Sequence, residues 1–255
     1  MPEETRETAS SGVPYPPQAI RAFVGPGDFV GIGNAWRDFF VESAGLAPGF
    51  RVLDVGSGIG RIAIPLTEVM GLEGSYEGLE IKQTAVDWCK NNISSRYPNF
   101  RFSHLDVLNQ CYNPEGKFAA AEYPFPFGAG EFDLVILTSV FTHMFPADME
   151  HYLQEIGRVL KPGGKCVITF YLLNEYSRER IADGTSKRLF KHPINEVCAT
   201  SKPDDPEQFI AFDEAYVRRL YEGCRLRIDE IQYGGWSGRE PAARRQDVIL
   251  AHRTS

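Results

Sequence analysis

The residues with the clearest chemical use form a glycine-rich segment, Gly56-Ser57-Gly58-Ile59-Gly60. An apolar run from Val52 to Val55 precedes it and predicts a buried parallel strand, and a helical pattern begins at Arg61. A helix leaves backbone N–H groups free in its first turn, and glycines let a ligand lie directly against the main chain. The strand, turn and helix in this order therefore predict a loop that holds a ligand.

Two carboxylates accompany this loop. Asp54 lies two residues before its first glycine, and Glu80 ends the predicted second strand, 74–81. A carboxylate roughly 20 to 25 residues after such a loop, at the tip of the neighbouring strand, can accept hydrogen bonds from both hydroxyls of a ribose. The competing interpretation of Glu80 is a solvated glutamate at a strand end. Together the loop and Glu80 indicate a nucleotide-like ligand.

The glycine spacing is G-x-G-x-G and differs from the G-x-G-x-x-G of dinucleotide-binding enzymes. Together with Asp54, this loop resembles the first motif of class I S-adenosylmethionine-dependent methyltransferases. The resemblance covers most of residues 50–171. It continues through Glu80, Asp106, the segment Phe132–Ser139 and the segment Leu160–Gly164.

The resemblance implies a Rossmann-like α/β fold with a seven-stranded, mostly parallel sheet, an antiparallel last strand and helices on both faces. Residues 1–17 are polar and proline-rich, which predicts a disordered tail. We expect residues 18–255 to form a single methyltransferase domain with an inserted lid at about 172–211. The aromatic-rich segment 20–44, interrupted by Gly25-Pro26-Gly27, fits either a flap over the cofactor edge or a helix that covers a sheet face.

The resemblance also implies which residues contact S-adenosylmethionine. Glu80 is expected to bind the ribose hydroxyls and Asp106 the adenine amine. The full predicted set is Asp54, Gly56, Ser57, Gly58, Gly60, Arg61, Glu80, Ile81, Asp106, Val107, Thr138 and Ser139.

The acceptor side is predicted at the tip of the strand 132–139, where the resembled enzymes place the transferring methyl group. His143 follows this tip, and we interpret it as a general base or an orienter of the acceptor, since an imidazole titrates near neutral pH. The alternative is a histidine that merely caps or packs at the start of the next helix. Further candidate substrate contacts are Phe141, Tyr171, Trp236 and Arg239, with Trp236 expected to be exposed in a glycine-flanked loop.

Three segments add residues without extending the predicted sheet: the insertion 172–211, the loop 111–130, and Trp236 with Arg239. Since specificity usually lies in loops on a rigid scaffold, we expect these segments to close the acceptor pocket. The insertion carries a basic run that fits either a solvated face or a lid binding an anionic group of the acceptor. This run consists of Arg178, Arg180, Lys187, Arg188 and Lys191.

Composition limits the remaining possibilities. The chain has 255 residues, 43% of them hydrophobic, and a formal net charge of −7, so we expect no nucleic-acid partner. Its five cysteines are scattered, which argues against a disulfide framework or a zinc site, and no run approaches about 18 apolar residues. A cytoplasmic enzyme without a membrane span and without a bound metal is expected.

The predicted activity is methyl transfer from S-adenosylmethionine to a hydroxyl of a small molecule or glycan. Thr138-Ser139-Val140-Phe141 stands where enzymes that methylate amino groups carry an Asn/Asp-Pro-Pro-Tyr/Phe tetrapeptide, which disfavours methylation of a base nitrogen. An N- or C-methyltransferase of small molecules is the first alternative. A cofactor-binding adaptor without activity is more remote, as is an NAD-dependent oxidoreductase, which the loop spacing and the lack of a Tyr-x-x-x-Lys pair oppose.

Overall fold

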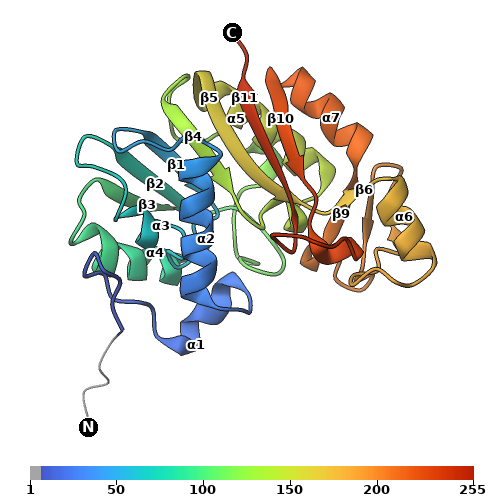
Figure 1. Ribbon diagram of the computed structural model, residues 1–255, viewed down its shortest axis with the longest axis horizontal. Helices are drawn as coiled ribbons and strands as arrows, with labels where there is room; N and C mark the ends of the chain where they lie inside the picture. The colour runs from blue at the N-terminus through green and yellow to red at the C-terminus, as the bar shows by residue number, and fades with distance from the viewer. Residues whose placement is uncertain (1–6) are drawn as a thin grey trace. The chain divides into compact units, whose positions relative to one another are not determined.

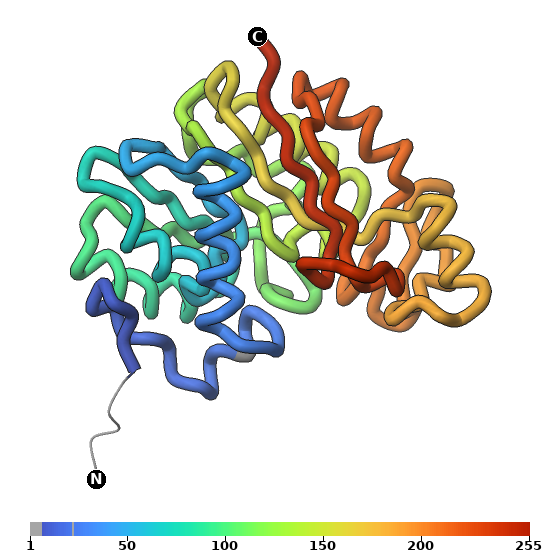
Figure 2. Tube along the Cα trace, viewed as in Figure 1, coloured from blue at the N-terminus to red at the C-terminus, as the bar shows by residue number. Residues whose placement is uncertain are grey.

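The computed structural model of the protein describes residues 7–255, apart from the side chain of Ala22, as two compact units that divide between Leu105 and Asp106. Figure 1 labels the elements of both units, and Figure 2 traces the chain through them. Each unit has its own strands and helices, and each contains some of the predicted site residues.

Unit 1 contains three parallel strands, β1 (Arg51–Val55), β2 (Ser75–Glu80) and β3 (Phe100–His104). The register pairs Val55 with Leu79 and Glu80 with His104, so Glu80 lies at the carboxyl end of its strand beside the start of the glycine loop. The helices are α2 (Phe29–Glu42), α3 (Ala63–Leu66) and α4 (Gln83–Cys89), the last continuing as a π-helical turn, η2 (Lys90–Ser94). The helical pattern that begins at Arg61 forms only the short helix α3, which turns flank on both sides.

The amino-terminal part of unit 1 differs from the disordered tail expected over residues 1–17. Residues 1–6 lie outside the described residues, but Thr8 and Pro14 form a β-bridge and Val13 is fully buried. The Tyr97 hydroxyl donates a hydrogen bond to the Ser11 carbonyl at 2.8 Å. Residues 7–17 therefore pack on unit 1, partly through contacts with distant segments that a polar composition does not reveal. The short helices α1 (Gln18–Arg21) and η1 (Ala22–Val24) follow.

Unit 2 contains β4 (Phe132–Leu137), β5 (Leu160–Phe170), β10 (Leu226–Gln232) and β11 (Asp247–Arg253). The strands β4 and β5 are parallel, whereas β11 runs antiparallel to both of its neighbours, β5 and β10. The helices α5 (Pro146–Val159) and α7 (Glu214–Gly223) lie beside β5 and β10 (Figure 1). The seven strands follow the order β10-β11-β5-β4-β1-β2-β3, which confirms the predicted mostly parallel sheet with an antiparallel last strand.

The insertion 172–211 contains a second, smaller sheet that the sequence did not predict. Its order is β6-β9-β8-β7, and the helix α6 (Glu175–Ala182) lies beside β6 (Figure 1). The strands are β6 (Leu172–Leu173), β7 (His192–Pro193), β8 (Cys198–Thr200) and β9 (Ile210–Asp213). Behind them lies a buried cluster that includes Tyr171, Leu173, Ile181, Phe190 and Trp236. The insertion therefore has a core of its own.

Candidate active site

The glycine loop of unit 1 is anchored to the end of β2 by backbone and carboxylate hydrogen bonds. Gly56 N and Ser57 N donate to the Leu79 carbonyl at 2.8 and 3.0 Å. Gly58 N donates to Glu80 Oε2 at 2.8 Å, and Lys82 N donates to Glu80 Oε1 at 2.9 Å. Glu80 thus holds the glycine loop against the carboxyl end of β2.

Glu80 is buried, and this burial raises the pKa of its carboxyl, while hydrogen bonds from the Lys82 and Gly58 amides oppose the increase. An ionised carboxylate offers about four acceptor sites, and these two amides use two of them. The remaining lone pairs can accept hydroxyl donors. The predicted ribose contact is therefore compatible with the bonds that Glu80 already makes.

Asp54 lies fully buried behind the loop, where the Tyr76 hydroxyl donates a hydrogen bond to its Oδ2. Burial raises the pKa of Asp54 to about 7, and it also lowers the pKa of Arg61, which the Asp54 charge opposes. Among the described residues, Asp54 Oδ1 and the buried Ser57 Oγ have no hydrogen-bond partner. Buried polar atoms are normally paired, so these two unpaired oxygens beside a bare glycine loop fit a polar cofactor.

The segment η1 lies against the loop. A Cβ at Gly58, whose φ is +55°, would clash with Val24 Cγ1, and Lys82 Nζ lies 4.7 Å from the centroid of the Phe23 ring. Both alternatives for the segment 20–44 thus have a counterpart in the chain: η1 contacts the loop as a flap would, and α2 packs against α3. A side chain at position 58 would need this flap to move.

The remaining predicted cofactor residues have less distinctive surroundings. The Ile81 carbonyl is hydrogen-bonded to His104 Nε2 at 3.0 Å. In unit 2, Asp106 is half-buried and forms an ion pair with the exposed Lys117 at 3.1 Å, and Val107 is buried. Since Lys117 lies on the surface, its side chain can leave Asp106 at little cost.

The tip of β4 is held by β5 and by the segment before β11. Ser139 N donates to Thr169 Oγ1 at 2.7 Å, and Ser139 Oγ donates to Gln246 Oε1 at 2.9 Å. Ser139 has a φ of 60°, a left-handed conformation that few non-glycine residues adopt, whereas Thr138 does not share it. These bonds fix the backbone at the point where the chain leaves the sheet toward His143.

His143 ends the short helix η4 (Phe141–His143) and is half-buried. Its Nδ1 lies 2.8 Å from the Glu207 carbonyl, and its Nε2 lies 3.4 Å from the Tyr112 hydroxyl. Burial lowers the pKa of His143, the Glu207 carbonyl opposes this, and the charge of Arg188 lowers the pKa further. Because a carbonyl can only accept, Nδ1 carries the proton and Nε2 is free to accept one.

Two residues around His143 were not predicted as site residues. Tyr112 packs edge-on against the imidazole, with ring centroids 5.1 Å apart, and Glu207 lies in η5 (Pro206–Gln208). Asn109 Nδ2 donates to the His143 carbonyl at 3.2 Å, while its Oδ1 accepts from the Tyr112 amide at 3.0 Å. The turn-forming residues after Tyr112 were the sequence signal for this loop, but they do not indicate which element the loop approaches.

Two of the four candidate substrate contacts, Phe141 and Trp236, are fully buried. Phe141 is fully buried and packs on Phe170 at a centroid distance of 5.4 Å, so it belongs to the core. The expectation that Trp236 is exposed is wrong, because only 1% of its surface is accessible and its Nε1 donates to Asp247 Oδ2 at 2.8 Å. The buried carboxylate also accepts from the Leu172 amide.

The other two candidates, Tyr171 and Arg239, both contact aromatic rings. Tyr171 is buried between Phe190 and Trp236, at centroid distances of 5.0 and 5.4 Å. The Arg239 guanidinium stacks on the rings of Tyr176 and Tyr233 at 3.9 and 4.5 Å. Arg239 is therefore held in place by aromatic faces.

The basic run of the insertion does not form one continuous face. Arg178 pairs with Asp213, Arg180 with Asp183, and Lys187 with Glu240 at 3.1 Å, and Lys191 is exposed. Arg188 differs from them. It is half-buried with its guanidinium 3.5 Å from the centroid of the Phe209 ring, and no carboxylate of the described residues pairs with it.

The described residues 7–255 contain neither a metal-ligand cluster nor a membrane-spanning helix. No group of three or more histidine, cysteine or acidic side chains in this range could hold a metal ion. None of its helices combines the length and apolar character needed to cross a membrane.

Comparisons with known proteins relate this geometry to a family. Residues 52–164 match the family model of the methyltransferase domain. The chain is 32% identical over 136 residues to a ubiquinone/menaquinone biosynthesis C-methyltransferase, UbiE, of Xanthomonas campestris, a match that covers 53% of this chain and 48% of that protein. The chain thus spans about half the length of these curated relatives.

Solved structures share the fold. The PH0226 protein from Pyrococcus horikoshii is 15% identical, with a TM-score of 0.61 over 94% of this chain and 100% of that one. A magnesium protoporphyrin IX methyltransferase from Synechocystis is 16% identical, with a TM-score of 0.57 over 92% of each chain.

One relative overturns an expectation drawn from charge. The chain is 28% identical over 142 residues to a tRNA N(3)-cytidine methyltransferase, METTL2, of Danio rerio, covering 55% of this chain and 36% of that protein. The prediction that excluded a nucleic-acid partner is therefore wrong. A net charge of −7 describes the whole chain and does not report local clusters of arginine.

The glycine loop with its unpaired buried oxygens, the position of Glu80 and the family match at residues 52–164 agree with one another. Residues 52–164 are therefore similar to the methyltransferase domain, and their loop and carboxylates fit S-adenosylmethionine as the cofactor.

Proposed function

We propose that this protein transfers a methyl group from S-adenosylmethionine to a hydroxyl group, with His143 as the general base. The observation that carries this proposal is the orientation of the His143 ring, in which Nδ1–H is bound to the Glu207 carbonyl and Nε2 remains an acceptor. Burial lowers the pKa of His143, so the imidazole is neutral and able to take a proton near pH 7.

The residues of unit 1 are proposed to hold the cofactor. Glu80 would accept the ribose hydroxyls, and the Gly56–Gly60 backbone with Ser57 Oγ would bind the amino-acid end. Asp106 is proposed to accept the adenine amine. When bound, S-adenosylmethionine supplies a methyl group on a positively charged sulfur, which makes that methyl reactive without further activation.

The residues of unit 2 are proposed to prepare the acceptor. The acceptor hydroxyl loses its proton to His143 Nε2 while its oxygen forms the new bond to the methyl carbon. Tyr112, 3.4 Å from Nε2, would hold the ring in position until the acceptor hydroxyl replaces it. Correct alignment and removal of the proton are the two contributions that this region would make to the rate.

The similarity to a C-methyltransferase of quinone biosynthesis favours a carbon acceptor as the second candidate. A base that ionises a phenolic hydroxyl activates the ring carbons as well as the oxygen, so His143 has the same role in either reaction. We do not limit the methyl acceptor to small molecules and glycans, because a tRNA methyltransferase is among the relatives. We propose a cytoplasmic setting, in which the five unpaired cysteines stay reduced.

The experiment that tests this function is a search for the acceptor. Purified protein and S-adenosylmethionine are added to a small-molecule extract and to total RNA, and mass spectrometry detects species that gain one methyl group. We expect at least one methylated product that is missing when the cofactor is omitted. Binding of the cofactor with no methylated product in either fraction would contradict catalysis and favour an adaptor.

A further inference from the structure

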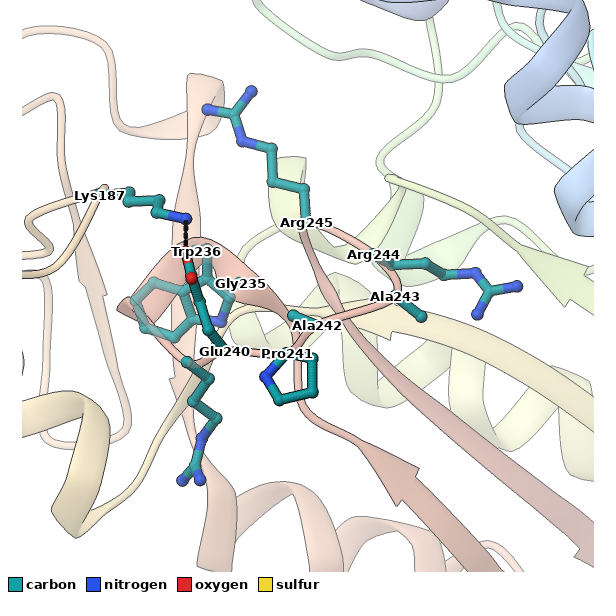
Figure 3. A pocket seen from close by; sticks show the side chains of 10 residues that line it. Lys187, Gly235, Trp236, Glu240, Pro241, Ala242, Ala243, Arg244 and Arg245 are labelled. Atoms are coloured by element: carbon teal, nitrogen blue, oxygen red, sulfur yellow. Dashed lines mark hydrogen bonds and ion pairs between the residues drawn. The ribbon is translucent and has the colours of Figure 1, made fainter.

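The strongest unused feature of unit 2 is a concentration of positive charge in a chain whose net charge is negative. An open pocket of about 730 Å³ lies next to η6 (Gly235–Ser237). Four of the side chains that line it are cationic and one is a carboxylate, namely Lys187, Arg239, Arg244 and Arg245 against Glu240. Glu240 is already paired with Lys187, as the dashed line in Figure 3 shows.

Arg244 and Arg245 leave adjacent positions of the pocket loop in different directions (Figure 3). Arg244 is half-buried, and burial lowers the pKa of its guanidinium. Arg245 is exposed, and no carboxylate of the described chain pairs with it. The pocket wall therefore presents one partly desolvated guanidinium and one that has no counter-ion.

Arg188 extends this cluster toward His143. Burial lowers the pKa of Arg188, and the nearby charge of Arg245 lowers it further. The Phe209 ring connects Arg188 to His143, because its centroid lies 3.5 Å from the Arg188 guanidinium and 6.0 Å from the centroid of the His143 ring. Like charges held close together are unfavourable unless an anion offsets them.

The Arg188 side chain is built for a directional contact. Its guanidinium lies over the Phe209 ring at 3.5 Å and near the Tyr171 ring at 5.7 Å, which fixes the plane of the fork. Nη1 has a single weak contact, with Ser201 Oγ at 3.4 Å, and Nε is buried with no partner among the described residues. A rigid guanidinium with unused donors matches the two oxygens of a carboxylate or phosphate.

We infer that the Arg188 guanidinium forms an anion subsite that binds a carboxylate or phosphate group of the methyl acceptor, with the charge of Arg245 as a weaker contributor. This inference rests on the proposed function for its link to the acceptor, but the anion subsite itself does not depend on catalysis. It narrows the acceptor to a molecule that carries a negative oxygen group within reach of the hydroxyl that His143 deprotonates.

The test uses phenyl phosphate and benzoate as probes with the full chain, measured by calorimetry at low ionic strength. Binding of either probe that depends on Arg188 supports the subsite, and the tighter probe identifies the anion. Arg188→Gln should weaken that probe tenfold or more, because a bidentate charged contact is lost, and Arg245→Gln about threefold. Lys191→Gln, which removes an exposed cation of the same insertion, is the matched control and should bind as the wild type does.

Two results would overturn the subsite: no saturable binding of either probe, or an equal loss in Lys191→Gln and Arg188→Gln. If Arg188→Gln fails to fold, Arg188→Lys keeps the charge and should still lose several-fold affinity, since the fork is gone. S-adenosylhomocysteine is titrated into the same samples. Retained cofactor binding without probe binding refutes only this inference, whereas lost cofactor binding in the wild type refutes the proposed function.

Discussion

The glycine-loop region of unit 1 and the His143 region of unit 2 differ in the charge of their side chains. They also differ in how far apart in the sequence their residues lie. In unit 1 the glycine loop is flanked by two buried carboxylates, Asp54 and Glu80, which suit hydroxyl donors and a positively charged sulfur. In unit 2 the partly buried groups are a neutral imidazole and the guanidinium of Arg188. The difference indicates that one region is built to bind a cofactor and the other to bind and deprotonate an acceptor.

The largest expected effect is the loss of turnover when His143 is replaced. His143→Asn should lower turnover by about 10²–10⁴-fold, the usual contribution of a general base, because asparagine cannot take the acceptor proton. Steady-state kinetics with the acceptor found by the extract screen provides the measurement. Tyr112→Phe serves as the control, since it keeps the packing on the imidazole and should reduce turnover far less. Equal turnover in His143→Asn and wild type would remove His143 from the mechanism.

A smaller effect is expected on the pH dependence of stability, through Asp54 of unit 1. Its pKa is raised from 3.8 to about 7, so the folded state holds this proton more tightly than the unfolded chain does. The Asp54 contribution to the free energy of unfolding should therefore fall as the pH rises from about 4 to about 7. Chemical denaturation across this range should give a flatter pH profile for Asp54→Asn than for the wild type. Parallel profiles would mean that Asp54 is ionised throughout.

The smallest expected effect is a change in the pKa of His143 when the charge of Arg188 is removed. The charge of Arg188 lowers the pKa of His143, so Arg188→Gln should move the imidazole titration to higher pH. NMR titration of the His143 ring in the free protein measures this shift directly. Lys191→Gln removes a charge that makes no such contribution and should leave the titration in place. A His143 titration that is the same in Arg188→Gln and wild type would show that the two groups are not coupled.

The two regions also differ in how far the sequence predicted them. The glycine loop, Asp54 and Glu80 lie within 27 consecutive positions, 54–80, and each is placed by the local pattern of strand, turn and helix. The fold was predicted from the family resemblance that these local motifs carry. The second sheet, β6-β9-β8-β7, and the packed segment 7–17 were not predicted.

The acceptor region could not be predicted in this way, because its contacts join distant segments. The His143 ring bonds to Glu207, 64 positions away, and to Tyr112, 31 positions away. The strands β6–β9 have two to four residues each, too few for a pattern of alternation to appear. The burial of Trp236 depends on Asp247, a carboxylate whose partners no local signal reveals.

The most direct test of the division between the two regions is calorimetry of S-adenosylhomocysteine binding to three proteins, the wild type, Glu80→Ala and His143→Asn. Charge-assisted hydrogen bonds are worth about 1.5–3 kcal/mol each when desolvated, so Glu80→Ala should lose tenfold or more in affinity. Glu80→Gln, which keeps an oxygen for the Gly58 amide, controls for loosening of the loop and should fall between Glu80→Ala and wild type. The account predicts wild-type affinity in His143→Asn. Unchanged affinity in Glu80→Ala, or an equal loss in His143→Asn, would contradict it.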